Sequence, residues 1–235
     1  METNFSYGAR LGRANNLNVI INEFKDYDPP RKEESKEGFQ AFVNSLIQIN
    51  QSETNLVKEY RMLVIERKEV FFTGSDSVMK KFIAIKRAVA SQYGKKSAEV
   101  ILLSSIKERM QKSRSLKVTP EVTGNEQRKP VSQIEKSYGA ITKNFHDYVT
   151  TISGFTDYKP GNNDLKLDSL NAYLEKLNKV NDEIAQKMSQ LTSIKIVRQA
   201  MYSELKERAG RIKLYVSSKY GADSDEFNQI RSIQL

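Results

Sequence analysis

The sequence predicts an all-α protein made of two tandem-duplicated helical-bundle units, each with three or four helices around one long central helix. Three observations predict this class. Apolar residues recur at helical spacing over long stretches, Pro and Gly number only 5 and 11 in 235 residues, and the landmarks of 1–115 return in the same order in 131–235. A composition of 38% apolar and 29% charged residues suits helices with one buried stripe.

The duplication rests on two long blocks of matched residues. The tetrapeptide "SYGA" at 6–9 returns at 137–140, and "FKDYDP" at 24–29 returns as "FTDYKP" at 155–160, both at an offset of 131. Near the end of each copy the offset falls to 127, so the second copy lacks four residues near "FFTGSDSV". We therefore predict two domains, 1–115 and 131–235, joined by a linker at 116–130, each of which can fold as a unit and then pack against the other.

Each copy begins with a helix and a turn. Helices are expected at 7–26 and 132–154, both ended by the "F-x-D-Y-x-P" element, because proline cannot continue a helix. Asp26 and Asp157 are expected to accept hydrogen bonds from nearby backbone amides in that turn.

The long central helix follows. In copy two the apolar stripe between 167 and 205 has no Pro or Gly, which predicts one uninterrupted helix. In copy one the stripe covers 39–70, with a break possible at 50–52. A third helix is expected at 76–93, capped by Ser75 or Asp76, and at 207–220, where the chain either turns near Ala209-Gly210 or continues straight.

The stretches "QYGKKSAEV" (92–100) and "KYGADSDEF" (219–227) predict a corner between two helices. Glycine follows the tyrosine where a helix end turns left-handed, and serine then caps a new helix with glutamate in its first turn. A polar site made of these Tyr, Ser and Glu side chains is the disfavoured alternative, because no base and nucleophile are paired.

Few enzyme classes fit the sequence. There is no Cys and one His, His146, which suits neither a thiolate site nor a two-histidine di-iron site, and no phosphate-binding loop or nucleophile elbow occurs. Arg67 and Arg198 match between the copies and are interpreted as a shared structural ion pair rather than an anion site. We expect no catalytic residue, no cofactor and no metal.

The formal charge of +9 is concentrated between 86 and 117. This cluster predicts a polyanion-binding segment, with a solvated surface as the alternative. Only one aromatic residue, Tyr93, lies in it, which argues against a stacking platform for single-stranded nucleic acid. The candidate residues are Lys86, Arg87, Lys95, Lys96, Lys107, Arg109, Lys112 and Arg114.

The N-terminal segment "METNFSYGARLGR" lacks the apolar core of a signal peptide, and no apolar run approaches the length of a membrane span. We expect a cytoplasmic protein.

In copy two the landmarks follow the order "F-x-D-Y-x-P", "L-x-x-L-N-A-Y-L-x-x-L-x-x-x-N", "R-Q-A-M-Y" and "V-S-S-K-Y-G-A-D-S-D-E-F-N-Q-I". This order resembles uncharacterised helical proteins of Bacteroidota, in which a helix ends in Tyr-Gly or Phe-Gly before a Ser and a glutamate-aromatic pair. The resemblance implies an all-helical fold and a bacterial cytoplasmic setting, and the group has no assigned activity to carry over.

Two hypotheses for the function remain. The first is a non-enzymatic protein-interaction or scaffolding module that binds a protein partner, or a second copy of itself, through helix faces. The second is a nucleic-acid-binding accessory protein that uses the basic segment 86–117.

Overall fold

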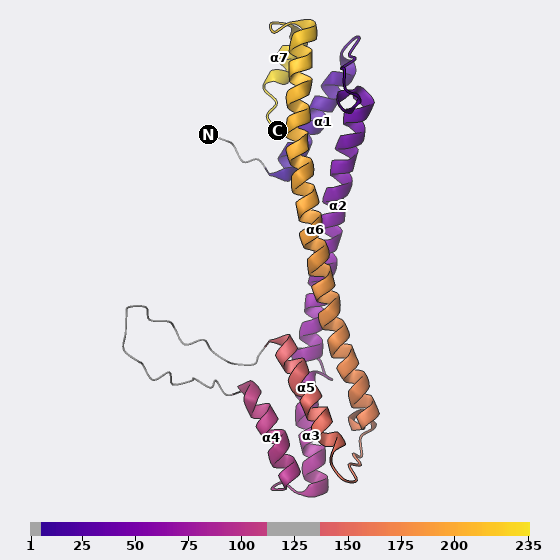
Figure 1. Cartoon of the computed structure of the whole chain (residues 1–235), viewed down its shortest axis with the longest axis vertical. Helices are drawn as coiled ribbons and strands as arrows, with labels where there is room; N and C mark the ends of the chain where they lie inside the picture. Colours follow the sequence, from indigo (N-terminus) through magenta and orange to yellow (C-terminus); the bar gives the residue numbers. More distant parts are fainter. Residues whose placement is uncertain (1–5, 112–136) are drawn as a thin grey trace, which may run out of the picture. The chain divides into compact units, whose positions relative to one another are not determined.

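The computed structural model describes residues 6–111 and 137–235, and within these ranges all regular secondary structure is helical, which confirms the all-α prediction (Figure 1). Two short 3₁₀ turns and a π-helical turn accompany the α-helices. The α-helices are α1 (Tyr7–Glu23), α2 (Lys36–Lys68), α3 (Val78–Tyr93), α4 (Ala98–Gln111), α5 (Tyr138–Ser153), α6 (Leu167–Tyr220) and α7 (Asp225–Arg231). None of these helices has the length and apolar character that crossing a membrane requires.

The chain forms two compact units, and their boundaries differ from those predicted. Unit 1 combines residues 1–60 with 187–235, and unit 2 contains residues 61–186. The predicted domains 1–115 and 131–235 are therefore each divided between the two units. The reason is that α2 and α6 are continuous helices that begin in one unit and end in the other. The predicted linker, 116–130, lies outside the described residues.

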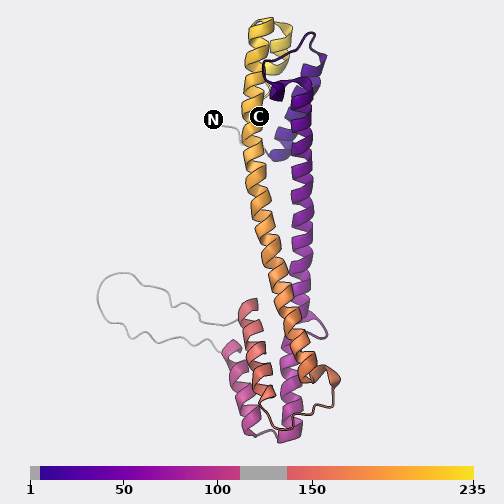
Figure 2. The ribbon, with the colours of Figure 1, turned by 45° about the vertical axis from the view of Figure 1, so that its right-hand side comes forward.

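Unit 1 contains α1, the first part of α2, the last part of α6 and α7. Within it α1 lies beside the start of α2, and α7 lies beside the end of α6 (Figures 1 and 2). α1 and α7 also contact each other. Its core joins residues from the two ends of the sequence. The fully buried members include Leu17, Ile21, Phe39, Leu46, Leu205, Ile212 and Val216.

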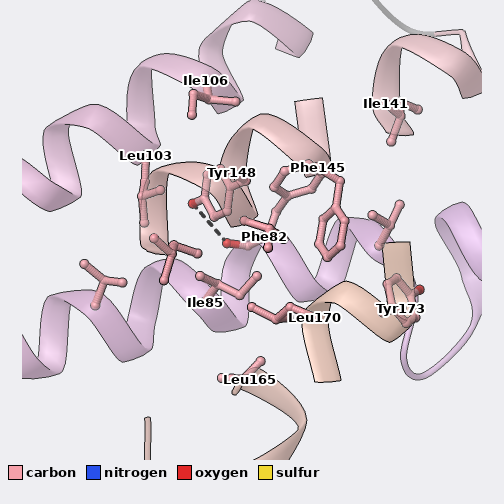
Figure 3. Packing of buried hydrophobic residues seen from close by; sticks show 14 of the residues in the cluster. Phe82, Ile85, Leu103, Ile106, Ile141, Phe145, Tyr148, Leu165, Leu170 and Tyr173 are labelled. Atoms are coloured by element: carbon pink, nitrogen blue, oxygen red, sulfur yellow. Dashed lines mark hydrogen bonds between the residues drawn. The ribbon is translucent and has the colours of Figure 1, made fainter. Parts of the chain in front are cut away.

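Unit 2 contains the end of α2, then α3, α4 and α5, and the start of α6. Its core is rich in aromatic rings, which meet where α3 and α5 pack together (Figure 3). The Phe82 ring lies 5.5 Å from that of Phe145 and 4.9 Å from that of Tyr148, both edge to face. The Tyr148 hydroxyl donates a hydrogen bond to the Phe82 carbonyl at 3.3 Å, so its polar end is satisfied inside the core.

The long helices are more regular than the sequence suggested. α2 runs for 33 residues without the break considered possible at 50–52, and α6 runs for 54 residues and continues straight through Ala209-Gly210, one of the two alternatives. The polar residues near 50–52 are accommodated inside the helix. Asn50 donates to the Tyr202 hydroxyl at 2.7 Å, and Thr54 donates back to the Asn50 carbonyl at 2.9 Å. The N-cap of α3 is Ser77, and not Ser75 or Asp76.

The two predicted helix corners are confirmed. Gly94 and Gly221 end α3 and α6 with φ angles of 96° and 107°, a region in which a side chain causes strain. After them Ser97 Oγ accepts from the Val100 amide at 3.4 Å, and Ser224 Oγ accepts from the Phe227 amide at 3.1 Å. Each serine thus caps the helix that follows.

The "F-x-D-Y-x-P" turns form by a different interaction from the one expected. Asp26 and Asp157 have left-handed backbones, with φ of 56° and 60°, but neither carboxylate accepts a hydrogen bond from a backbone amide of the described residues. The adjacent tyrosines stabilise the turns instead. Tyr27 and Tyr158 donate their hydroxyls to the carbonyls of Glu34 (2.9 Å) and Leu165 (3.0 Å), and burial raises the pKa of Tyr158 to about 12.

Candidate functional site

The predicted basic cluster lies on α3, on α4 and on the corner between them. Lys86 and Arg87 belong to α3, Lys95 and Lys96 to the corner, and Lys107 to α4. Arg109 is in α4, but the structure does not describe its side chain. Lys112 and Arg114 lie outside the described residues. The structure thus brings six of the eight candidate residues onto one helix pair and its corner, because α3 and α4 pack directly against each other, and the side chains of five of them are described.

An open groove of about 570 Å³ lies between the two helices. We call it the α3–α4 groove. Its α3 side carries Lys86 and Ala90, the corner adds Lys95, and α4 supplies apolar side chains, hydroxyls and one carboxylate. The lining residues are Lys86, Ala90, Lys95, Val100, Ile101, Ser104, Ser105 and Glu108. The groove therefore combines positive charge with an apolar surface.

The five described cations of the cluster have no hydrogen-bond or ion-pair partner in the part of the chain that the structure covers. Lys81, on the same helix, differs: its Nζ lies 2.6 Å from Asp76 and 5.3 Å from the centre of the Tyr173 ring. Lys81 is thus a buried structural cation. The unpartnered cations are available to an anionic ligand, at no cost in broken native bonds.

The matching surface of unit 1 uses its cations for structure. Lys213, which matches Lys86 at the offset of 127, donates to the carbonyls of Arg231 (3.1 Å) and Ile233 (2.5 Å). Those carbonyls are free to accept because α7 ends at Arg231. α4 instead continues to Gln111, so the matching carbonyls, those of Ser104 and Ile106, lie inside the helix, and Lys86 has no hydrogen-bond partner among the described residues. Burial lowers the pKa of Lys213.

Exposed apolar side chains accompany the basic residues. Ile101 and Leu102 of α4 are 62% and 51% exposed, and Ile83 of α3 is 39% exposed. The sequence analysis did not identify these exposed residues. Helical spacing gives the signal: Val100, Leu103 and Ile106 are buried, so Ile101 and Leu102 must lie on other faces of the same helix.

The corner that carries Lys95 and Lys96 is fixed in position by the turn after α5. The Tyr93 hydroxyl donates to the Thr156 carbonyl at 2.6 Å, and Gln92 Oε1 accepts from the Lys159 amide at 3.0 Å. Burial, with smaller contributions from the charges of Glu99 and Asp157, raises the pKa of Tyr93. Tyr93 therefore acts as a structural donor at this corner.

The other candidates of the sequence do not form a catalytic arrangement. The His146 side chain is 61% exposed and lies 3.9 Å from Asp147. Arg198 forms the expected ion pair, with Glu53. Arg67 has no ion pair among the described residues; its guanidinium stacks on the Tyr138 ring, 3.9 Å from the ring centre. Among the described residues no three His, Cys, Asp or Glu side chains are grouped as metal ligands.

Comparison of the chain with protein-family models, curated proteins and solved structures gives no match.

Proposed function

We propose that this chain is a non-enzymatic protein-interaction module, and that its α3–α4 groove binds an acidic, partly apolar segment of a partner protein. The proposal rests on one observation. Lys86 and Lys95 have no hydrogen-bond or ion-pair partner among the described residues, and they line the same groove as the exposed Ile101. A segment with Asp or Glu beside apolar side chains would neutralise those charges and cover the apolar surface at once.

The charge balance of the surrounding segment favours an acidic partner. Residues 78–108 contain seven basic and two acidic residues, and the matching residues 205–235 contain six and four. Complementary charge accelerates association and selects against basic partners. The apolar component would supply affinity that persists in salt.

Nucleic acid is the alternative ligand, favoured by the five unpartnered cations. Phosphate contacts would neutralise the lysines, but the sugar–phosphate backbone would leave Ile101 and Leu102 without an apolar partner. Affinity for nucleic acid should also fall steeply with salt, because each phosphate contact releases condensed counterions. Salt dependence therefore separates the two ligands.

Fluorescence anisotropy tests the proposal with three labelled probes of equal length: an amphipathic peptide rich in Glu and Leu, a polyglutamate peptide, and single-stranded DNA. We expect the amphipathic peptide to bind tightest and to remain bound at high salt. The double variant Lys86→Glu/Lys95→Glu should weaken it at least tenfold. Ile101→Ser should weaken it several-fold, with no effect on polyglutamate.

The matched control is Lys176→Glu/Lys195→Glu, which makes the same change in net charge at exposed positions of α6. If this control weakens peptide binding as much as Lys86→Glu/Lys95→Glu does, binding depends on overall charge and the groove is not the site. If DNA binds tightest and Ile101→Ser has no effect, the nucleic-acid alternative replaces the proposal. Light scattering on the unliganded protein tests whether the partner is a second copy of this chain.

We also propose a bacterial cytoplasmic setting, supported by the sequence resemblance and by the lack of Cys. The proposal is tested by fractionation of the source cells with an antibody against the chain; recovery in a secreted fraction would contradict it.

A further inference from the structure

At three places, matching positions of the two sequence copies make the same contact, and each contact joins one copy to the other. The Phe24 ring lies 5.8 Å from that of Tyr220, and the Phe155 ring lies 5.9 Å from that of Tyr93. Phe155 matches Phe24 at the offset of 131, and Tyr220 matches Tyr93 at the offset of 127. If each copy folded by itself, the pairs would be Phe24 with Tyr93 and Phe155 with Tyr220.

Hydrogen bonds at the same places repeat this crossed arrangement. The Tyr220 hydroxyl donates to the Lys25 carbonyl at 2.7 Å, and the Tyr93 hydroxyl donates to the Thr156 carbonyl at 2.6 Å. Thr156 matches Lys25 in the sequence. Both bonds therefore join the corner of one copy to the first turn of the other copy.

Arginine–tyrosine stacking gives a third, independent pair. The Arg198 guanidinium lies 4.3 Å from the centre of the Tyr7 ring, and that of Arg67 lies 3.9 Å from the centre of the Tyr138 ring. Arg198 matches Arg67, and Tyr138 matches Tyr7, both at the offset of 131. Again neither arginine contacts the tyrosine of its own copy.

We infer that the two copies of a duplicated sequence exchange halves with each other. Each compact unit therefore contains the first half of one copy and the second half of the other. The length of α2 gives the physical reason. Its 33 residues extend for about 50 Å at 1.5 Å per residue, so its two ends cannot contribute to one small core. One copy alone lacks half of each core, and its natural partner is a second copy, which in this protein belongs to the same chain.

Double-mutant cycles in the full-length protein test the inference. The four changes are Phe24→Leu, Tyr220→Leu, Phe155→Leu and Tyr93→Leu. We expect the shifts in denaturation midpoint to be non-additive for Phe24 with Tyr220 and for Phe155 with Tyr93, because these side chains touch. The pairs Phe24 with Tyr93 and Phe155 with Tyr220 should be additive. The opposite pattern would overturn the exchange.

A second experiment does not depend on how well those variants fold. A protease recognition sequence is placed in the segment 116–130 of the full chain, and the folded protein is cleaved there. We expect the cleaved protein to elute as one particle with the mass of the intact chain at high dilution, and to lose its helical signal in the same thermal transition. Release of two separately folded fragments, 1–115 and 131–235, would overturn the inference.

Discussion

Glu53 of α2 and Arg198 of α6 form an ion pair whose side chains are only 11% and 18% exposed. The guanidinium also stacks on Tyr7, so three helices of unit 1 meet at this point. In unit 2 the matching arginine, Arg67, stacks on Tyr138 in the same way, but Ile184 occupies the position that matches Glu53. Among the described residues, the stacking therefore occurs in both units, whereas the ion pair occurs in unit 1 alone.

We predict that Glu53→Gln lowers the free energy of unfolding by about 3 kcal/mol, because it leaves a largely buried arginine without its counter-charge. Urea denaturation followed by circular dichroism measures this loss. The control is Glu204→Gln, since Glu204 pairs with Arg208 at 2.5 Å but its side chain is 46% exposed. Its cost should stay below about 1 kcal/mol. Equal costs for the two variants would contradict the assigned role of Glu53.

Glycine substitutions should change stability in opposite directions at two kinds of position. Gly94→Ala and Gly221→Ala should each destabilise the protein by about 1–2 kcal/mol, because alanine is strained at their positive φ angles. Gly210→Ala should stabilise it by about 0.5–1 kcal/mol, since Gly210 is exposed in the interior of α6 and nothing lies within 4 Å of an added Cβ. Thermal melts of the three variants measure these changes in stability. If all three variants shifted the melting temperature in the same direction, the described backbone angles would be contradicted.

Two neighbouring residues of α3 separate the core of unit 2 from its exposed surface. Phe82 is fully buried against Phe145 and Tyr148, whereas Ile83 is 39% exposed. Phe82→Ala should cost about 3–5 kcal/mol through lost burial and a cavity, and Ile83→Ala should cost below about 1 kcal/mol. Guanidinium denaturation of both variants measures the difference. A small cost at Phe82 would mean that these rings do not pack as described.

The protein should lose stability in alkali. Tyr27, Tyr148, Tyr158 and Tyr173 each donate a buried hydroxyl to a backbone carbonyl, and burial raises the pKa of each above the ordinary value of 10. A raised folded-state pKa means that this contribution to stability is complete below pH 10 and is lost as the pH rises through the raised values.

Tyrosinate absorbance and circular dichroism, recorded together, check this expectation. Some of the 11 tyrosines should ionise near their ordinary pKa without loss of helix, and the buried group should ionise at about pH 12 or above together with unfolding. Tyr158→Phe should reduce by one the number of tyrosines that ionise at about pH 12 or above. Ionisation of all tyrosines in one early step, with the helix signal intact, would contradict the buried donors.

Local features of the fold could be predicted from the sequence, because neighbouring residues determine them. The Tyr-Gly corners needed only a glycine at a left-handed position and a serine three residues later, and both formed as expected. The pairing of distant segments could not be predicted. Phe24 faces an equivalent tyrosine whether it packs on Tyr93 or on Tyr220, so composition and spacing are identical for the two arrangements.

The candidate site was predictable only in part, for a similar reason. The positions of Lys86 and Lys95 in a basic segment follow from the sequence. Whether a lysine remains unpartnered depends on where a neighbouring helix ends. Lys213 binds carbonyls freed by the end of α7, and Lys86 faces a helix that continues. The sequence does not show the difference, because the matching segments "SIKE" (105–108) and "SIQL" (232–235) alone do not determine those helix ends.

The division of unit 1 between the two ends of the chain has a consequence for biosynthesis. The ribosome releases residues 6–60 well before their core partners, among them Leu205 and Ile212. Unit 2, residues 61–186, can close its core earlier, while the apolar faces of α1 and α2 are still without partners. We therefore expect unit 2 to fold before unit 1 during translation, while α1 and the first part of α2 still lack the α6 residues that complete their core.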